Sequence, residues 1–235
     1  MFPFSSLRSF LFALLIALVP AGLYAQEDLT EVGWARKMVS AGLVNLSEKI
    51  PDIKVDLMYS RKDNFMGTDV YGALEDAYLN PGFAEKLGKA QTLLKQELGS
   101  KYSLIVYDAA RPLSVQRKMW DIVRDTPNRK YVASPARGGG RHNYGLAVDL
   151  SIVDTVTGTP LDMGSSVDHF GITSHIGDEA ALVKSGLITP EAKSNRAYLH
   201  GLMKRVGLRP IRKEWWHFEE YTSIRSVRKH KLLDF

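Results

Sequence analysis

The sequence of 235 residues contains no cysteine. This absence excludes a disulfide framework and a lipid-modified cysteine, so we expect stability to come from packing alone. Beyond the first 25 residues there is also no apolar run long enough to cross a membrane, no internal repeat and no low-complexity segment. What remains has ordinary apolar content and fits one globular domain better than two.

A secretory leader is predicted over residues 1–25. Arg8 supplies the positive start and Phe10 to Val19 the apolar core, and we expect cleavage after Ala25, an uncleaved anchor being the alternative. Residues 26–235 would form the mature domain in a bacterial periplasm or outside the cell. There, neither nucleic acid nor a stable membrane span is expected.

The net charge of +5 is modest, and only the end of the chain gathers basic residues. We interpret this cluster as a solvated face, with contact to an anionic envelope polymer as the functional alternative. Its members are Arg225, Arg228, Lys229, His230 and Lys231.

Hydrophobic periodicity predicts short strands and amphipathic helices. Two helices have clear starts, because Asn80-Pro81 and Thr189-Pro190 each place a capping residue before a proline. Residues 27–45 are only weakly periodic and predict an extended segment with a helical turn or two. The strands are expected at about 53–57, 103–107 and 146–152, and the helices at about 81–98, 113–124 and 190–206.

His142 and Asp149 stand seven residues apart across a glycine turn. From Leu146 onward apolar and other residues alternate, so Asp149 should project from a half-buried strand. On one unbroken strand an odd spacing would send the two side chains to opposite faces, so convergence requires a reversal near Gly145. The pair is typical of half a metal site.

A second cluster, Lys213 to Phe218, places Glu214 and His217 three residues apart among bulky aromatics. Three protein ligands with a position left for water are typical of catalytic zinc, and His142, Asp149 and His217 would supply them. Glu214 would be the spare carboxylate. Aromatic content favours a strand here, where residues three apart oppose each other, so a bulge or strand end is needed. The same ligand types also serve non-haem iron, and the spare Glu214 favours zinc.

Three other features leave alternatives open. Arg111, at a strand-to-helix junction, could pair structurally with Asp108 or aim its charge into a pocket. The loop from Tyr59 to Gly67 could be a surface excursion or a wall of the substrate site. His169 and His175 are rival metal ligands, although loop histidines are more often solvated.

These motifs together resemble the zinc peptidases grouped with lysostaphin, D-Ala-D-Ala carboxypeptidase and hedgehog, and within that group the D-alanyl-D-alanine dipeptidases. The resemblance spans about Leu46 to Phe218. It rests on His142-x-x-Gly145-x-Ala147-x-Asp149, Glu214-Trp215-Trp216-His217, the segments 107–112 and 162–168, and the loop 63–67. We therefore expect an α+β fold, a single domain with a small, mainly antiparallel sheet carrying one zinc ion and flanked by helices.

The resemblance implies that zinc activates a water and polarises a peptide carbonyl, while Glu214 moves the proton from water to the leaving amine. Arg111 would stabilise the oxyanion. Asp168 would bind the free amino terminus of a short substrate, and Ser165 and Tyr144 would also contact the substrate. One departure affects the substrate: Gly140 stands where the family usually has a serine that helps hold it.

The expected activity is hydrolysis of D-Ala-D-Ala or related short D-amino-acid dipeptides. One alternative is a D,D- or L,D-carboxypeptidase acting on peptidoglycan stems, whose fragments would then be partners. Another is a non-catalytic, zinc-containing cell-wall binding module. Wall-precursor destruction in antibiotic resistance and salvage of wall dipeptides require the same chemistry.

Overall fold

The computed structural model describes residues 31–235, and the predicted leader lies outside the described residues. The α-helices are α1 (Glu31–Ser40), α2 (Leu46–Lys49), α3 (Pro81–Leu98), α4 (Leu113–Val123), α5 (Glu179–Lys184), α6 (Pro190–Arg205) and α7 (Ile224–Val227). The strands are β1 (Val44–Asn45), β2 (Lys54–Val55), β3 (Tyr78–Leu79), β4 (Tyr102–Asp108), β5 (Ala147–Asp154), β6 (Thr159–Pro160), β7 (Leu208–Ile211) and β8 (Glu214–Glu220). Short 3-10 helices are η1 (Met58–Ser60), η2 (Pro127–Lys130), η3 (Arg141–Tyr144) and η4 (Ile172–Ser174).

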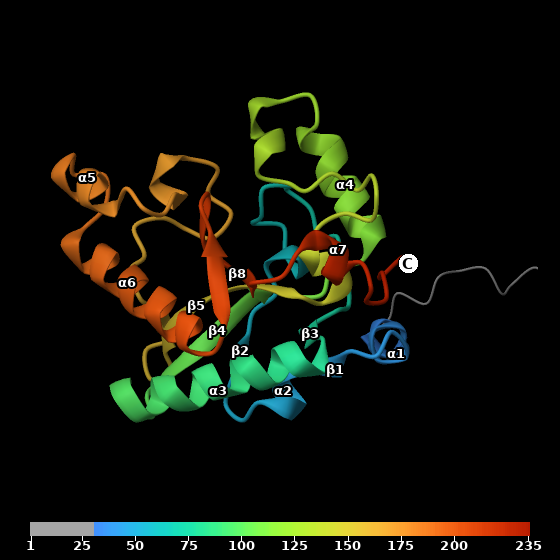
Figure 1. Cartoon of the computed structure of the whole chain (residues 1–235), viewed down its shortest axis with the longest axis horizontal. Helices are drawn as coiled ribbons and strands as arrows, with labels where there is room; N and C mark the ends of the chain where they lie inside the picture. The colour runs from blue at the N-terminus through green and yellow to red at the C-terminus, as the bar shows by residue number, and fades with distance from the viewer. Residues whose placement is uncertain (1–30) are drawn as a thin grey trace, which may run out of the picture.

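The main sheet has the strand order β2-β4-β5-β8-β7, with β6 paired to the end of β5 (Figure 1). Only β2 and β4 run parallel; the other pairs in this sheet are antiparallel. β1 and β3 form a separate antiparallel pair. The expected α+β domain with a mainly antiparallel sheet is confirmed.

The predicted helix starts are also confirmed. The Asn80 side chain accepts a hydrogen bond from the Gly82 amide at 3.1 Å at the start of α3. The Thr189 hydroxyl accepts one from the Ala192 amide at 2.9 Å at the start of α6. α3 packs against β4, α6 packs against β7, and the two helices contact each other, so together they cover part of the sheet (Figure 1).

Strand β5 lies at the centre of the sheet between β4 and β8. The predicted alternation is present, but the expectation of a half-buried strand was wrong, because residues 147–153 are all buried. Leu150 and Ile152 pack in the main core, and Asp149 and Ser151 on the opposite face are also buried, with 3% and 2% of each residue exposed. The strand that carries Asp149 is therefore buried along nearly its whole length.

The N-terminal prediction also needs correction. Instead of an extended segment with a turn or two, residues 31–40 form the ten-residue helix α1. Trp34 and Met38, four residues apart, are both buried against the core, and this spacing is the helical signal in the segment. Within residues 31–235, no helix has both the length and the apolar character needed to span a bilayer.

Candidate metal centre and active site

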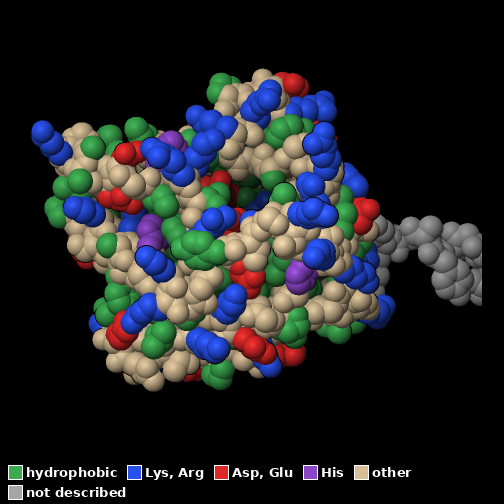
Figure 2. All heavy atoms as spheres, in the orientation of Figure 1, with side chains coloured by type: hydrophobic (Ala, Val, Ile, Leu, Met, Phe, Trp, Pro, Cys, Tyr) green, Lys and Arg blue, Asp and Glu red, His purple; other side chains and the backbone are tan. Residues whose placement is uncertain are grey.

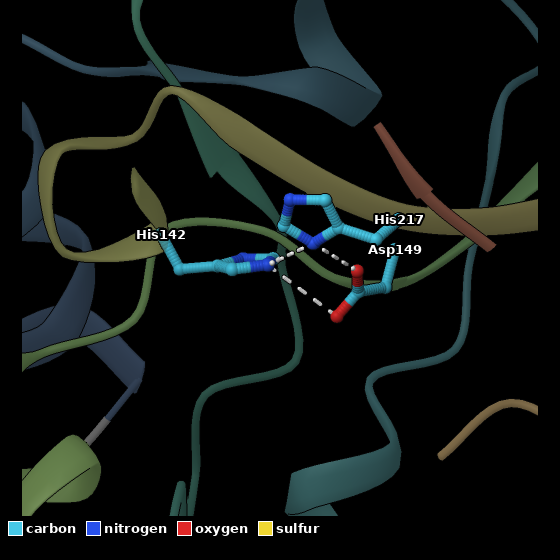
Figure 3. A group of neighbouring side chains, drawn as sticks. All are labelled: His142, Asp149 and His217. Carbon is cyan, nitrogen blue, oxygen red and sulfur yellow. Dashed lines mark hydrogen bonds and ion pairs between the residues drawn. The ribbon is translucent and has the colours of Figure 1, made fainter. Parts of the chain in front are cut away.

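Three side chains from distant parts of the sequence converge on one point. His142 Nε2 lies 3.1 Å from His217 Nδ1, and His217 Nδ1 lies 3.0 Å from Asp149 Oδ1. The third side of the triangle, from His142 Nε2 to Asp149 Oδ2, is 3.5 Å (Figure 3). All three residues are buried, and they form the group of potential metal ligands found among the described residues.

The sheet and one glycine place these ligands. Asp149 on β5 and His217 on β8 are direct cross-strand partners, so their side chains leave the sheet side by side. Gly145 has φ of 64°, the left-handed region, and ends η3 immediately before β5. This reversal turns His142 back toward Asp149, as the odd spacing required.

Glu214 reaches the same region because β8 is irregular. Pairing between β7 and β8 runs from Pro210 with Phe218 directly to Ile211 with Glu214, so β8 carries extra residues at this point. The register shift cancels the alternation that would place Glu214 and His217 on opposite faces. Glu214 Oε2 therefore lies 3.8 Å from His217 Nδ1, and the expected bulge is confirmed.

The donor chemistry of the triad fits a cation. His142 Nδ1 lies 2.7 Å from the Ala109 carbonyl oxygen, which only accepts hydrogen bonds, so Nδ1 carries the proton and the Nε2 lone pair faces the triad. Without a metal, the ring nitrogens and the carboxylate oxygens that face one another must share protons to avoid repulsion between their lone pairs. Burial opposes charge on His217, yet the neighbouring carboxylates of Asp149 and Glu219 raise its pKa to about 10. A bound zinc ion would satisfy the same lone pairs.

Arg111 combines both alternatives left open by the sequence. Its Nε donates to Asp108 Oδ2 at 2.9 Å, and its Nη1 donates to Gln116 Oε1 at 3.0 Å. Its Nη2 also lies 3.8 Å from Asp149 Oδ2, and the side chain lines the cavity above the triad. The structural pairing thus holds the guanidinium in the position where its charge faces the site.

The three ligands, Glu214 and Arg111 line one cavity of about 430 Å³. Figure 2 shows a hollow near the middle of this face, with acidic side chains inside it and basic ones around it. Burial raises the pKa of Glu214 to about 8, and the neighbouring Asp149 and Asp168 contribute in the same direction. A cation at the triad would lower that pKa again, because opposite charge favours the ionised carboxylate.

Asp168 closes another side of the cavity from the loop after β6. Its backbone has φ of 58°, and its Oδ2 accepts a short hydrogen bond from the Tyr59 hydroxyl. Burial, and then the charge of Asp149, raise the pKa of Asp168 to about 7. Fully buried Arg196 holds this loop by donating to the carbonyls of Met163 and Thr173 at 2.6 and 2.5 Å.

The loop that begins at Tyr59 is a wall of this cavity, because Tyr59 and Phe65 both line it. Phe65 packs against Phe170, which stacks on Tyr131 with ring centroids 4.9 Å apart. Three segments distant in the sequence thus meet as an aromatic rim.

Other predicted site residues lie elsewhere. Ser165 accepts a hydrogen bond from Trp215 Nε1 at 3.0 Å and lines a separate depression. Tyr144 is buried in the core. His175 Nε2 lies 3.2 Å from the Tyr131 hydroxyl, and neither His175 nor His169 belongs to the triad.

Residue-by-residue reading of the sequence missed three partners of the site. Tyr59 binds Asp168, Gln116 supports Arg111, and Tyr71 donates to Asp108 Oδ1 at 2.6 Å. Tyr71 and Asp108 are 37 residues apart and Tyr59 and Asp168 are 109 apart, so no local pattern marks them. Only Gln116, one turn into the helix after Arg111, carries a local signal, because it lies on the buried stripe of α4.

Comparisons with known proteins agree with this geometry. The D-alanyl-D-alanine dipeptidase of Escherichia coli K12 is 31% identical over 75% of this chain and 83% of its own length. That of Enterococcus faecium is 29% identical over 75% and 90%. A solved LD-carboxypeptidase, LdcB, aligns with 80% of this chain and 71% of its own at 15% identity and a TM-score of 0.40, too low a likeness for any inference. A family profile described as D-ala-D-ala dipeptidase matches residues 39–231, and the chain therefore belongs to this family.

Proposed function

We propose that this protein is a zinc metallopeptidase that hydrolyses D-Ala-D-Ala or related short D-amino-acid dipeptides. One observation carries the proposal: three buried donors converge while a carboxylate outside the triad and a fixed guanidinium face the same cavity. Membership in the family and relatives named D-alanyl-D-alanine dipeptidase give the substrate class.

His142, Asp149 and His217 would hold one zinc ion, in keeping with the zinc peptidases of this family. When bound, zinc supplies Lewis acidity to a water molecule and to the scissile carbonyl. Two imidazoles and one carboxylate leave room for such exogenous ligands. The burial of all three donors keeps bulk water from competing for the ion.

Glu214 is the proton carrier. It would accept a proton as the water oxygen bonds to the peptide carbon, then deliver that proton to the amine nitrogen as the C–N bond breaks. Its place at the bulge of β8, close to the triad, suits a group that must reach both atoms.

Arg111 and Asp168 would bind opposite charges on the substrate. Arg111 presents permanent positive charge where the carbonyl oxygen becomes negative. Asp168 would pair with the free amino terminus, whose ammonium favours the ionised carboxylate. This second contact would restrict the enzyme to very short substrates, whereas Tyr144 and Ser165, outside the cavity lining, have no part in the proposal.

The decisive experiment is an assay of zinc-reconstituted protein against D,D-, L,D- and L,L-dipeptides, each with a free and an acetylated amino terminus. We expect hydrolysis of free D-Ala-D-Ala and at least a 100-fold loss on acetylation. Preferred removal of the last residue from a peptidoglycan pentapeptide would instead identify a carboxypeptidase. Tight zinc binding without any hydrolysis would support the non-catalytic binding module.

We also propose that the protein acts in the periplasm or outside the cell after removal of residues 1–25. The leader pattern in the sequence supports this location. Amino-terminal sequencing of protein recovered from the periplasmic fraction should begin at Gln26. Recovery of the intact chain from membranes would show that the leader is kept as an anchor.

A further inference from the structure

Glu219 is a buried carboxylate that the proposed reaction does not use. It follows His217 by two residues on β8, so both side chains project from the same face of the strand. Its backbone pairs with Ala147 on β5 and with Arg209 on β7. Only 8% of the residue is exposed, which is unusual for a glutamate unless its charge is paired.

Two arginines hold this carboxylate. Arg141 Nε lies 2.7 Å from Glu219 Oε2, and Arg209 donates through Nη2 and Nε to Glu219 Oε1 at 3.0 and 3.2 Å. Arg141 is itself fixed by donating through Nη1 to the Thr222 hydroxyl at 3.0 Å. The carboxylate is therefore ionised and fixed in place.

The free edge of His217 faces this carboxylate. Nδ1 of His217 points into the triad, while its other nitrogen, Nε2, lies 3.6 Å from Glu219 Oε2. That distance exceeds a hydrogen bond, yet an ionised carboxylate there favours the tautomer with the proton on Nε2. The lone pair of Nδ1 is then left facing the metal position, as is that of His142 Nε2.

Arg141 gives the contact a second consequence. It directly precedes His142, so its ion pair with Glu219 links η3 to β8, the two elements that carry the histidine ligands. The ion pair is largely buried, with 11% of each side chain exposed, and solvent screens it weakly. Glu219 thus contacts one ligand directly and the other through the neighbouring residue.

We propose that Glu219 is a positioning residue of the metal centre: held by Arg141 and Arg209, it orients the imidazole of His217 and fixes the spacing between the two histidines. This inference rests on the zinc site of the proposed function. It assigns Glu219 an effect on metal affinity and on the tautomer of His217, and no contact with substrate. Carboxylates behind metal-bound histidines commonly change affinity 10- to 100-fold.

The test measures zinc affinity by competition with a chromophoric chelator, without substrate. Glu219→Gln should bind zinc about 10- to 100-fold more weakly than the unmodified protein. Glu220→Gln is the matched control, because Glu220 is the next residue, and its carboxylate pairs with Lys86 Nζ at 2.7 Å away from the triad. An unchanged zinc affinity in folded Glu219→Gln overturns the proposal.

Two further measurements keep the test decisive. Nitrogen NMR of the zinc-loaded proteins should show a proton on His217 Nε2 that exchanges with water faster in Glu219→Gln than in the unmodified protein, because the carboxylate that holds it has been removed. If Glu219→Gln does not fold, Arg209→Gln decides, since it removes one support from a more exposed position. It should weaken zinc binding by a smaller factor, and unchanged affinity would overturn the proposal.

The readouts separate this inference from the proposed function. Zinc affinity that falls only in Glu219→Gln, in a protein that cleaves no dipeptide, supports the positioning role and refutes the dipeptidase. Efficient dipeptide cleavage by the unmodified protein, with equal zinc affinity in Glu219→Gln and Glu220→Gln, supports the dipeptidase and refutes the positioning role.

Discussion

Arg111 and Asp108 are joined twice at the exit of β4, because Nε and Nη2 of the guanidinium both donate to Oδ2 of the same buried carboxylate. A flat, forked donor can satisfy Asp108 and still present its remaining edge to the cavity, whereas an ammonium cannot do both. The pair is therefore a support for the site as much as a contribution to stability.

Replacing Arg111 with lysine should lower kcat about 100- to 1,000-fold, the cost typical of losing one oxyanion donor. KM should change little, because the contact strengthens only as negative charge develops. Steady-state kinetics on D-Ala-D-Ala would measure this. Arg117→Lys is the control, because Arg117 lies on helix α4, which follows Arg111, and forms an exposed ion pair with Asp234. Activity of Arg111→Lys within a few-fold of the control would remove Arg111 from the mechanism.

Glu214→Gln should lose hydrolysis by roughly 100- to 10,000-fold, because glutamine cannot carry the proton. Its zinc content, measured by atomic absorption, should stay at one ion per chain, since Glu214 lies outside the convergent triad. Glu191→Gln, at the exposed start of α6, controls for the loss of one negative charge. Loss of zinc together with activity would show that Glu214 is a ligand instead.

Asp168→Asn should change how stability depends on pH in the metal-free protein. The folded pKa of about 7 lies above the ordinary 3.8, so folding takes up a proton in this interval. The stabilisation is complete below about pH 4 and is lost as pH rises through 7, on the order of 4 kcal/mol in total. Asparagine tolerates the left-handed backbone and does not titrate. Urea unfolding from pH 4 to 8 should show a flatter profile in the variant; an identical profile would contradict the assignment.

Gly145→Ala should destabilise the fold by about 2–3 kcal/mol. A Cβ there meets Leu43 Cδ2 at 2.8 Å and the Asn80 amide nitrogen at 3.2 Å, in addition to the strain of φ 64°. Gly158→Ala isolates the strain, because Gly158 has φ of 72° with open space around it, and about 1 kcal/mol is expected. Equal losses in thermal unfolding would show that the close approach to Leu43 is unimportant.

The sequence predicted the parts of this protein that depend on neighbours along the chain. The caps at Asn80 and Thr189 and the alternation after Leu146 are local, and the structure has them. The burial of β5 on both faces was missed because alternation reports only which side chains are polar. Ser151 is polar and was assigned to an exposed face, yet it is buried.

The site divides in the same way. The two residue clusters predicted the candidate metal triad and the neighbouring Glu214, and their convergence became visible only in the pairing of β5 with β8. Ser165 stands in a segment that resembles the substrate-binding loop, yet its hydroxyl is occupied by Trp215 of a strand 50 residues away. Such a partner follows from the packing of the whole domain and leaves no trace in the local sequence.

Asp149 and His217 are cross-strand partners on β5 and β8, which both lie inside the sheet, so neither ligand is carried by a mobile loop. Backbone amides on this pair should exchange with deuterated solvent only when the whole sheet opens, at a rate set by global unfolding. The rim built from Phe65, Tyr131 and Phe170 lies on loops and should exchange far sooner. Substrate entry would then depend on motion of the aromatic rim, while the metal ligands keep their positions until the whole domain unfolds.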